Sequence, residues 1–227
     1  MRFFNLLKNE LRFTVKYGIL LLYIILTAFY VVALSVIPEN ARQATGAVLI
    51  FTDPAAMGLF FMGAVMLLEK SQRVNHAIFV SPVKIDEYIT VKALSMLIVG
   101  TAAGAVIGIA GGANIVGAVL SVALSSFLFS LCAIIVAVKT GSLNSFLLSV
   151  VPMEIVIFVP ALLYLFGAVK SGLWVLHPGV SSIILLTEEQ SLWVCCVISL
   201  CLWNAAAFLL CRKAAVKYMC QLGGGKL

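Results

Sequence analysis

Six long apolar runs dominate the chain and limit what it can fold into. They cover residues 17–37, 46–68, 89–111, 117–138, 146–168 and 191–211. Each is close to the ~20 apolar residues that a helix needs to cross a bilayer. Only 11% of the residues are charged, whereas a soluble domain is roughly a quarter charged. We therefore predict an all-α integral membrane protein with six transmembrane helices, the first of them too long for a cleaved signal.

The basic residues are distributed unevenly between the two sides of these runs. If the N-terminus is cytoplasmic, all of the 15 Lys and Arg residues except Arg42 and Lys170 lie on the cytoplasmic side. Such a bias sets the orientation of membrane proteins, so we expect both termini in the cytoplasm. It also explains the net charge of +6. No aromatic-basic module accompanies that charge, so we expect no nucleic-acid partner.

Two charged segments flank the membrane domain, which we place at residues 17–211. In residues 1–16 the apolar Phe4, Leu7 and Leu11 share one helical face, while basic residues recur every four residues on another. This pattern predicts an amphipathic helix lying at the surface of the bilayer, with its basic side toward anionic lipid. Residues 212–227 form a basic cytoplasmic tail.

Small residues in the third run predict close helix packing. Gly100, Gly104 and Gly108 repeat the G-x-x-x-G spacing, which lets two helix backbones approach closely. The contact lies either inside the bundle or at an interface with another subunit.

Prolines and polar residues interrupt other runs. Asp53-Pro54 divides the second run into a short outer piece and a main piece that begins at Pro54, since Asp-Pro is a helix start signal. Pro152 and Pro160 should kink the fifth span. Residues 173–190 are apolar but too broken to span twice, which predicts short, broken outer-leaflet helices between spans five and six.

Two carboxyl groups fall within the predicted spans, at Asp53 and Glu154. Ionisable groups at membrane depth are costly and usually face protein or water. The functional interpretation is that they line a substrate pathway. The structural alternatives are that Glu154 hydrogen-bonds a kinked backbone or a neighbouring helix, and that Asp53 is a helix N-cap.

No catalytic motif is evident. The sequence lacks the P-loop pattern G-x-x-x-x-G-K-[ST], and it also lacks H-E-x-x-H and G-x-S-x-G. Its two histidines, His76 and His177, should lie on opposite sides of the membrane. We therefore expect neither an enzyme nor a metal or cofactor site in this chain.

The main polar interruption between the runs is LLEKSQRVNHAIFVSPVKIDEYI, residues 67–89. Within it, Val74, Ala77 and Ile78 form an apolar patch at helical spacing. Ser81-Pro82 should end that helix, and Asp86 and Glu87 should begin the next one. The apolar residues are small for a membrane-surface helix, so we predict a short cytoplasmic helix that contacts another protein.

This segment resembles a known family. Glu69-Lys-Ser-x-Arg73, then Phe-Val-Ser81-Pro82-Val, Glu87-Tyr88 and Lys92 are similar to the loop after the second span of ABC-2 type transport permeases. The half-size drug-export permeases, such as the fluoroquinolone exporter permease subunit, are similar in length. The shared plan has six spans, cytoplasmic termini and an amphipathic N-terminal helix.

The resemblance implies an ATP-binding-cassette exporter in a bacterial-type plasma membrane. Loop 69–88 would hold a coupling helix that docks on a separate cytoplasmic ABC ATPase subunit, which carries ATP and Mg. A second permease copy or a sister permease would complete the complex, as a homodimer or heterodimer in the lipid bilayer. The implied coupling residues are Glu69, Arg73, Val74, His76, Ala77, Ile78, Ser81 and Pro82.

Two other functions compete with export of an amphiphilic or drug-like substrate. An ion-gradient-driven transporter could use Glu154 as its proton site. A non-transporting membrane scaffold or sensor subunit would need no pathway. A neighbouring reading frame that encodes an ATPase would distinguish the first function from these two.

Overall fold

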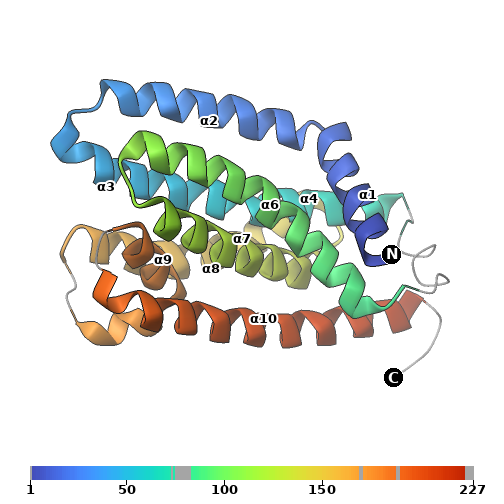
Figure 1. Ribbon diagram of the computed structural model, residues 1–227. Coiled ribbons are helices and arrows are strands. Elements are labelled where there is room, and N and C mark those ends of the chain that lie inside the picture. The colour runs from blue at the N-terminus through green and yellow to red at the C-terminus, as the bar shows by residue number, and fades with distance from the viewer. Residues whose placement is uncertain (1, 73, 75–82, 169–170, 188–189, 223–227) are drawn as a thin grey trace.

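The computed structural model describes residues 2–72, 74, 83–168, 171–187 and 190–222. Within these ranges every regular element is helical (Figure 1). In chain order the elements are α1 (Arg2–Lys16), α2 (Ile19–Val36), α3 (Glu39–Ile50), the π-helical turn η1 (Phe51–Ala55), α4 (Met57–Ser71), α6 (Ile85–Gly111), α7 (Ile115–Ala137), α8 (Leu143–Leu165), the 3-10 turn η2 (Gly172–Leu176), α9 (Pro178–Leu186), the 3-10 turn η3 (Gln190–Leu192) and α10 (Trp193–Leu222).

Six helical segments are long and apolar enough to cross a membrane, which confirms the prediction of six candidate spans. They are Ile19–Val36, Glu39–Ser71, Ile85–Gly111, Ile115–Ala137, Leu143–Leu165 and Gln190–Cys220. Successive segments run in opposite directions, so α1, the end of α4 and the start of α6 lie at one end of the bundle (Figure 1). We call this the basic end, because it carries Lys8, Arg12, Lys16, Lys70 and Lys84.

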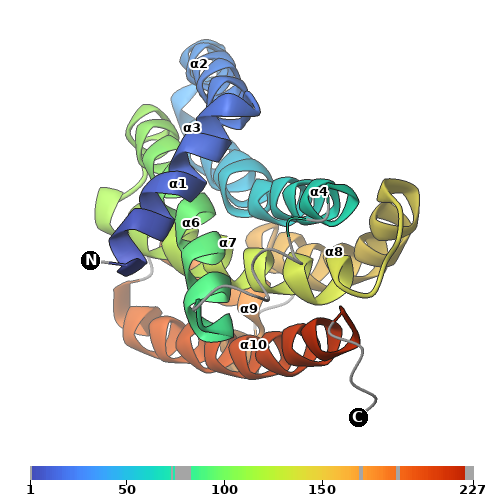
Figure 2. The ribbon, with the colours of Figure 1, turned by 90° about the vertical axis from the view of Figure 1, so that its right-hand side faces the viewer.

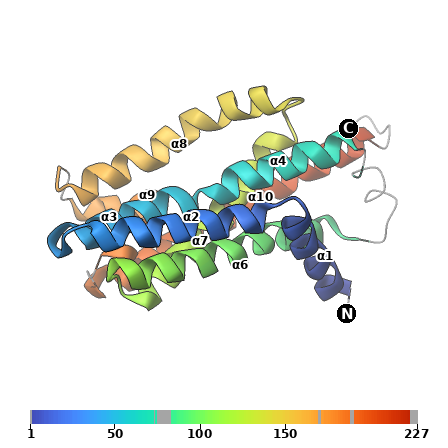
Figure 3. The same cartoon turned by 90° about the horizontal axis from the view of Figure 1, so that it is seen from above.

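α7 is the centre of the bundle. It packs against α4, α6, α8, α9 and α10, as the view onto the basic end shows (Figure 2). In its most apolar stretch 56% of the residues are buried, compared with 17% in α2 and 22% in α8. α2 and α8 therefore lie at the periphery (Figure 2, and Figure 3 for α8), and both expose large apolar side chains on their outer faces.

The glycines of α6 lie at close contacts within the chain. A Cβ at Gly100 would lie 2.6 Å from the carbonyl oxygen of Pro54. A Cβ at Gly104 would lie 2.5 Å from a valine methyl of α7, and one at Gly108 would lie 2.9 Å from Cβ of Ala118. These glycines thus allow α6 to pack directly on η1 and α7.

Gly100→Ala is expected to destabilise the bundle by about 1–3 kcal/mol, the usual cost of overpacking. The added methyl group meets backbone at Pro54 and not the end of a flexible side chain. Gly141→Ala is a matched control, because a Cβ there meets no atom within 4 Å. The measurement is the temperature at which each purified variant loses its monodisperse elution. Equal temperatures for the two variants would show that the α6–η1 contact is not tight.

Pro54 divides the second span, as predicted, but through a π turn. The outer piece is α3, the inner piece is α4, and η1 between them contains Pro54. Proline has no N–H group and its ring crowds the preceding turn. A single wide π turn accommodates such a disruption without ending the helix. α4 begins three residues later than Pro54, at Met57, and no side chain caps it, so the alternative role of Asp53 as an N-cap is wrong.

The segment between α8 and α10 forms short helices at the end opposite the basic end (Figure 1). All nine residues of α9 are buried, and α9 packs against α7, α8 and α10. The hydroxyl of Ser121 on α7 donates to the carbonyl of Ser182 at 2.8 Å. The hydroxyls of Ser125 and Ser182 lie 2.6 Å apart. α9 is thus part of the core and not a surface loop.

Candidate functional site

Three helices meet around one buried lysine at the basic end. Lys92 of α6 has no exposed surface, and its Nζ lies 2.6 Å from Oε1 of Glu69 at the end of α4. The same Nζ lies 3.0 Å from Oε1 of Glu10 on α1. Removing a charge from water is costly unless it is paired and hydrogen-bonded. The two carboxylates supply that pairing, and in doing so they join α1, α4 and α6.

Tyr88 completes the surroundings of Glu69. Its hydroxyl donates to Oε2 of Glu69 at 2.9 Å and lies 3.3 Å from the sulfur of Met66. Tyr88 and Lys92 are one turn apart on α6, so both reach the same carboxylate. Nζ of Lys92 also lies 5.1 Å from the centre of the Tyr88 ring. Both oxygens of Glu69 are therefore bound within the bundle.

Glu10 is the member of this cluster that lies outside the candidate spans. Burial raises the pKa of its carboxyl above the usual value, and the nearby Glu69 carboxylate adds to this rise, whereas Lys92 lowers the pKa. Glu10 therefore holds a proton more readily in the folded chain than in the unfolded chain. The side chain of Glu10 is only 14% exposed, so α1 is anchored to the bundle through a largely dry contact.

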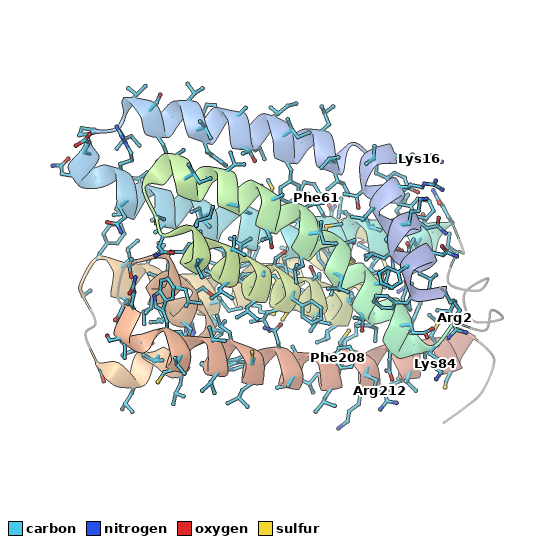
Figure 4. All side chains as sticks on the ribbon, in the orientation of Figure 1. Arg2, Lys16, Phe61, Lys84, Phe208 and Arg212 are labelled. Carbon is cyan, nitrogen blue, oxygen red and sulfur yellow. The ribbon has the colours of Figure 1, made fainter. Side chains whose placement is uncertain are left out.

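The first turn of α6 has two further ion pairs at its surface. Arg2 of α1 donates to both carboxylate oxygens of Glu87, at 2.6 and 2.7 Å. Arg212 of α10 lies 2.8 Å from Asp86. Figure 4 shows Arg2 and Arg212 close to this end of α6. Exposed pairs contribute about 0–1 kcal/mol each, so they orient the ends of α1 and α10 without dominating the stability.

Lys70 connects α4 to the end of α7. Its Nζ donates to the carbonyl oxygens of Thr140 at 2.8 Å and Val138 at 3.3 Å. The last carbonyls of a helix have no partner within the helix, so a lysine at this position stabilises the end of α7. Adjacent residues of α4 thus bind in two directions, Glu69 toward α6 and Lys70 toward α7.

These contacts hold helices together and leave little capacity for a ligand. Lys92 is fully buried and its two carboxylate partners are nearly so. In the part of the chain that the structure describes, no group of three or more His, Cys, Asp or Glu side chains is placed to hold a metal ion. The chemical role of the cluster is to fix the relative positions of α1, α4 and α6.

Glu154 lies near the middle of the 23-residue α8, partly exposed. Its helix neighbours Val151, Ile155 and Val156 are exposed as well, at 45%, 54% and 64%. The structural alternative expected a hydrogen bond from Glu154 to a kinked backbone or to a neighbouring helix. Among the described residues Glu154 has no such partner, so the structural alternative gains no support there.

Asp53 lies in η1, at the inner side of α2. With Tyr23 and Tyr30 of α2 it lines a small cavity closed by Ile107 of α6. The hydroxyl of Tyr23 is buried and has no hydrogen-bond partner among the described residues. Asp53 and Glu154 lie on different elements, η1 and α8.

The predicted coupling residues are only partly described. Glu69 lies in α4, buried as above, and Val74 is helical and partly buried. The other six coupling residues fall outside the described residues: Arg73, His76, Ala77, Ile78, Ser81 and Pro82. The described ends of this connection, Gln72 and Val83, follow α4 and precede α6. Helix α6 begins at Ile85, so Asp86 and Glu87 lie in its first turn, as predicted.

Sequence reasoning missed the pairing of Glu10, Glu69 and Lys92. In the sequence, Tyr88 and Lys92 stand out only as parts of a pattern, and Glu10 is not singled out at all. A signal was nevertheless present, because Glu10 is the only acid in an otherwise basic amphipathic segment. An acid there and a lysine just inside an apolar run are both unfavourable alone, and each provides the charge that the other lacks.

No protein-family model and no curated protein matches the chain.

Proposed function

We propose that the chain is the permease subunit of an ATP-binding-cassette exporter that moves an amphiphilic or drug-like substrate. ATP would be hydrolysed by a separate cytoplasmic ATPase subunit, and the basic end would face the cytoplasm. The proposal is supported by the resemblance of residues 69–92 to ABC-2 type permeases, and by a bundle with six candidate spans. The bias of Lys and Arg toward the basic end supports the orientation.

The observation that carries this proposal is the buried Lys92 cluster. α4 and α6 flank the connection 72–84, and Lys92 and Glu69 join these two helices at 2.6 Å. Glu10 adds α1 to the same unit. A force applied to residues 72–84 would therefore move the ends of α1, α4 and α6 together and would not simply bend one of these helices. Such a unit would suit an exporter at the place where the ATPase acts, and Glu69 would then be a positioning residue and not a direct ATPase contact.

A second subunit would cover the exposed outer face of the peripheral helix α8. A carboxyl group at membrane depth is costly against lipid, yet Glu154 lies on a helix with an exposed outer face. A second permease copy or a sister permease packed near α8 would enclose it in protein or in a polar pathway. Asp53 is the second candidate pathway residue, in η1 next to α2. Six spans per chain suit a half-transporter that pairs to make a route.

Glu154→Gln is expected to reduce export of a cationic substrate several-fold while leaving assembly intact. The amide keeps the shape and the hydrogen-bonding capacity but removes the negative charge. The matched control is Asn144→Asp, which also changes the charge by one unit, at an exposed position in the first turn of the same helix. Export is measured as uptake into inverted vesicles. Normal transport by Glu154→Gln would remove this residue from the pathway.

An ion-gradient-driven transporter remains a second candidate because Glu154 is unpaired among the described residues. A proton-coupled protein would transport in vesicles that carry a pH gradient but no ATP and no ATPase subunit. Transport that collapses with a protonophore and ignores ATP would favour this candidate over the exporter.

The proposed function is tested by purification with the ATPase subunit encoded beside this chain. The expected complex holds two permeases and two ATPases, and its ATP turnover rises with substrate. The permease purified alone is expected to hydrolyse no ATP, because its sequence lacks the loop that cradles phosphates. ATP turnover by the lone chain, or the absence of any bound ATPase, would contradict the proposal.

A further inference from the structure

A long apolar groove runs between α2 and α6. It has a volume of about 780 Å³ and is lined almost entirely by apolar side chains, with Leu11 and Val15 of α1 at its start. Leu20 and Val32 mark its extent along α2. From Leu20 to Val32 the groove extends for roughly 18 Å, at the rise per residue of an α-helix. This length is slightly more than half of the ~30 Å hydrocarbon core of a bilayer. The groove therefore has the length of one leaflet.

The groove is continuous with a hollow on α1 that carries positive charge. Leu11 and Val15 line both, and the hollow, of about 690 Å³, also contains Lys8, Arg12 and Lys16. All three basic side chains are exposed, and none forms a salt bridge with another described residue. Figure 4 shows Lys16 where α1 meets α2.

The negative charge of α1 is turned away from this surface. Glu10 is the only acid in α1, and it is paired with Lys92 inside the bundle. Arg2 is paired with Glu87. The side of α1 next to the groove therefore carries three cations and no anion, at the end where an apolar groove of one-leaflet length begins.

We infer that this surface binds one anionic phospholipid, with an acyl chain in the α2–α6 groove and its phosphate against Lys8, Arg12 and Lys16. Within a bilayer an apolar groove fills with acyl chains whatever the headgroup, because lipid tails are as apolar as its walls. The selectivity must then come from the charges on α1. A basic cluster at the membrane surface attracts anionic lipid in this way. Lipid binding at this surface would not require the chain to be a transporter.

A second copy of the chain is a less suitable occupant. A symmetric pair would bring the basic side of one α1 toward that of another, because a two-fold interface places the same surface on both subunits. On each side three cations that form no salt bridge with a described residue would face one another and repel. An anionic phospholipid instead neutralises these cations with its headgroup. Its acyl chain fills the apolar groove at the same time.

The test is lipid retention by the purified full-length chain, measured by native mass spectrometry. The protein is titrated with phosphatidylglycerol or phosphatidylcholine that carry identical acyl chains. The variant Lys8→Gln/Arg12→Gln/Lys16→Gln is compared with Lys139→Gln/Lys213→Gln/Lys217→Gln, which removes three exposed cations from the same end but away from the groove. A basic residue near an anionic surface changes binding by about fivefold. We therefore expect the α1 variant to lose about tenfold or more of its phosphatidylglycerol retention, and the control variant to lose little.

A second variant, Ala102→Phe, fills the groove without changing charge, because Ala102 is an exposed residue of its wall. It should reduce retention of both lipids. Equal retention of the two lipids by the unmodified chain, or equal losses in both triple variants, would overturn the inference. A loss of dimer in Ala102→Phe with unchanged lipid preference would show that a second copy occupies the groove, and would overturn it as well.

Discussion

Lys92→Met is expected to lower the free energy of unfolding by about 3–5 kcal/mol, the usual cost of removing one partner from a buried ion pair. The substitution leaves Glu10 and Glu69 buried with no counter-charge, because Lys92 is bound to both of them. α1 should then detach from α6 before the rest of the bundle unfolds. The measurement is unfolding in increasing SDS, together with protease cleavage of residues 1–16.

Two variants separate charge from packing at this site. Lys139→Met removes an exposed lysine at the same end and should have almost no effect. The triple variant Glu10→Gln/Glu69→Gln/Lys92→Met contains no buried charge, so it should recover most of the lost stability. If Lys92→Met and Lys139→Met unfold alike, the cluster does not hold the three helices together. If the triple variant is as unstable as Lys92→Met, the loss comes from packing and not from unpaired charge.

Ala77→Glu and Ile78→Asp are expected to abolish binding of the ATPase while the six spans still insert. The sequence places both residues at the centre of a small apolar patch, and neither lies in a predicted span. Burying an unpaired charge in a contact of this size costs several kcal/mol, which is a loss of affinity of about a hundredfold or more. The measurements are copurified ATPase per permease and substrate-stimulated ATP turnover.

The matched control is Gln72→Glu, which adds the same charge at an exposed position just after α4. It should leave ATPase binding within about twofold of the unmodified chain. Unchanged binding in Ala77→Glu and Ile78→Asp would mean that residues 72–84 only connect two helices. The exporter proposal would then lose its predicted contact with the ATPase.

The number and placement of the six spans could be predicted from the sequence because bilayer thickness fixes the length of an apolar helix. The ends were harder to place. α10 continues to Leu222, well past the predicted end of the span at residue 211. Its extension packs on the bundle through Cys211, Ala215 and Met219, which are spaced one turn apart and buried. Tertiary packing prolongs this helix, and hydropathy alone does not report such packing.

The sequence signals that Glu10 and Lys92 each need a partner, but it does not show which residues pair, because the members of the Lys92 cluster are far apart in the chain. Glu10, Glu69 and Lys92 come from three helices, and only the way these helices cross brings them together. Gly100 is the opposite case, since the G-x-x-x-G spacing alone indicates a close contact. The sequence left open whether that contact was internal, and the structure places Pro54 against Gly100.

The π turn at Pro54 gives the second span a preferred bending point. A helix bends most easily where its backbone hydrogen bonds are fewest, and η1 contains a residue with no N–H group to donate. α4 is held at its far end by Glu69 and Lys70, while α3 lies beyond the turn. A displacement of the joined ends of α1, α4 and α6 would therefore be taken up by bending at residues 51–55. Asp53 lies within this turn, so a small rotation of α4 relative to α3 would change the surroundings of its carboxyl group.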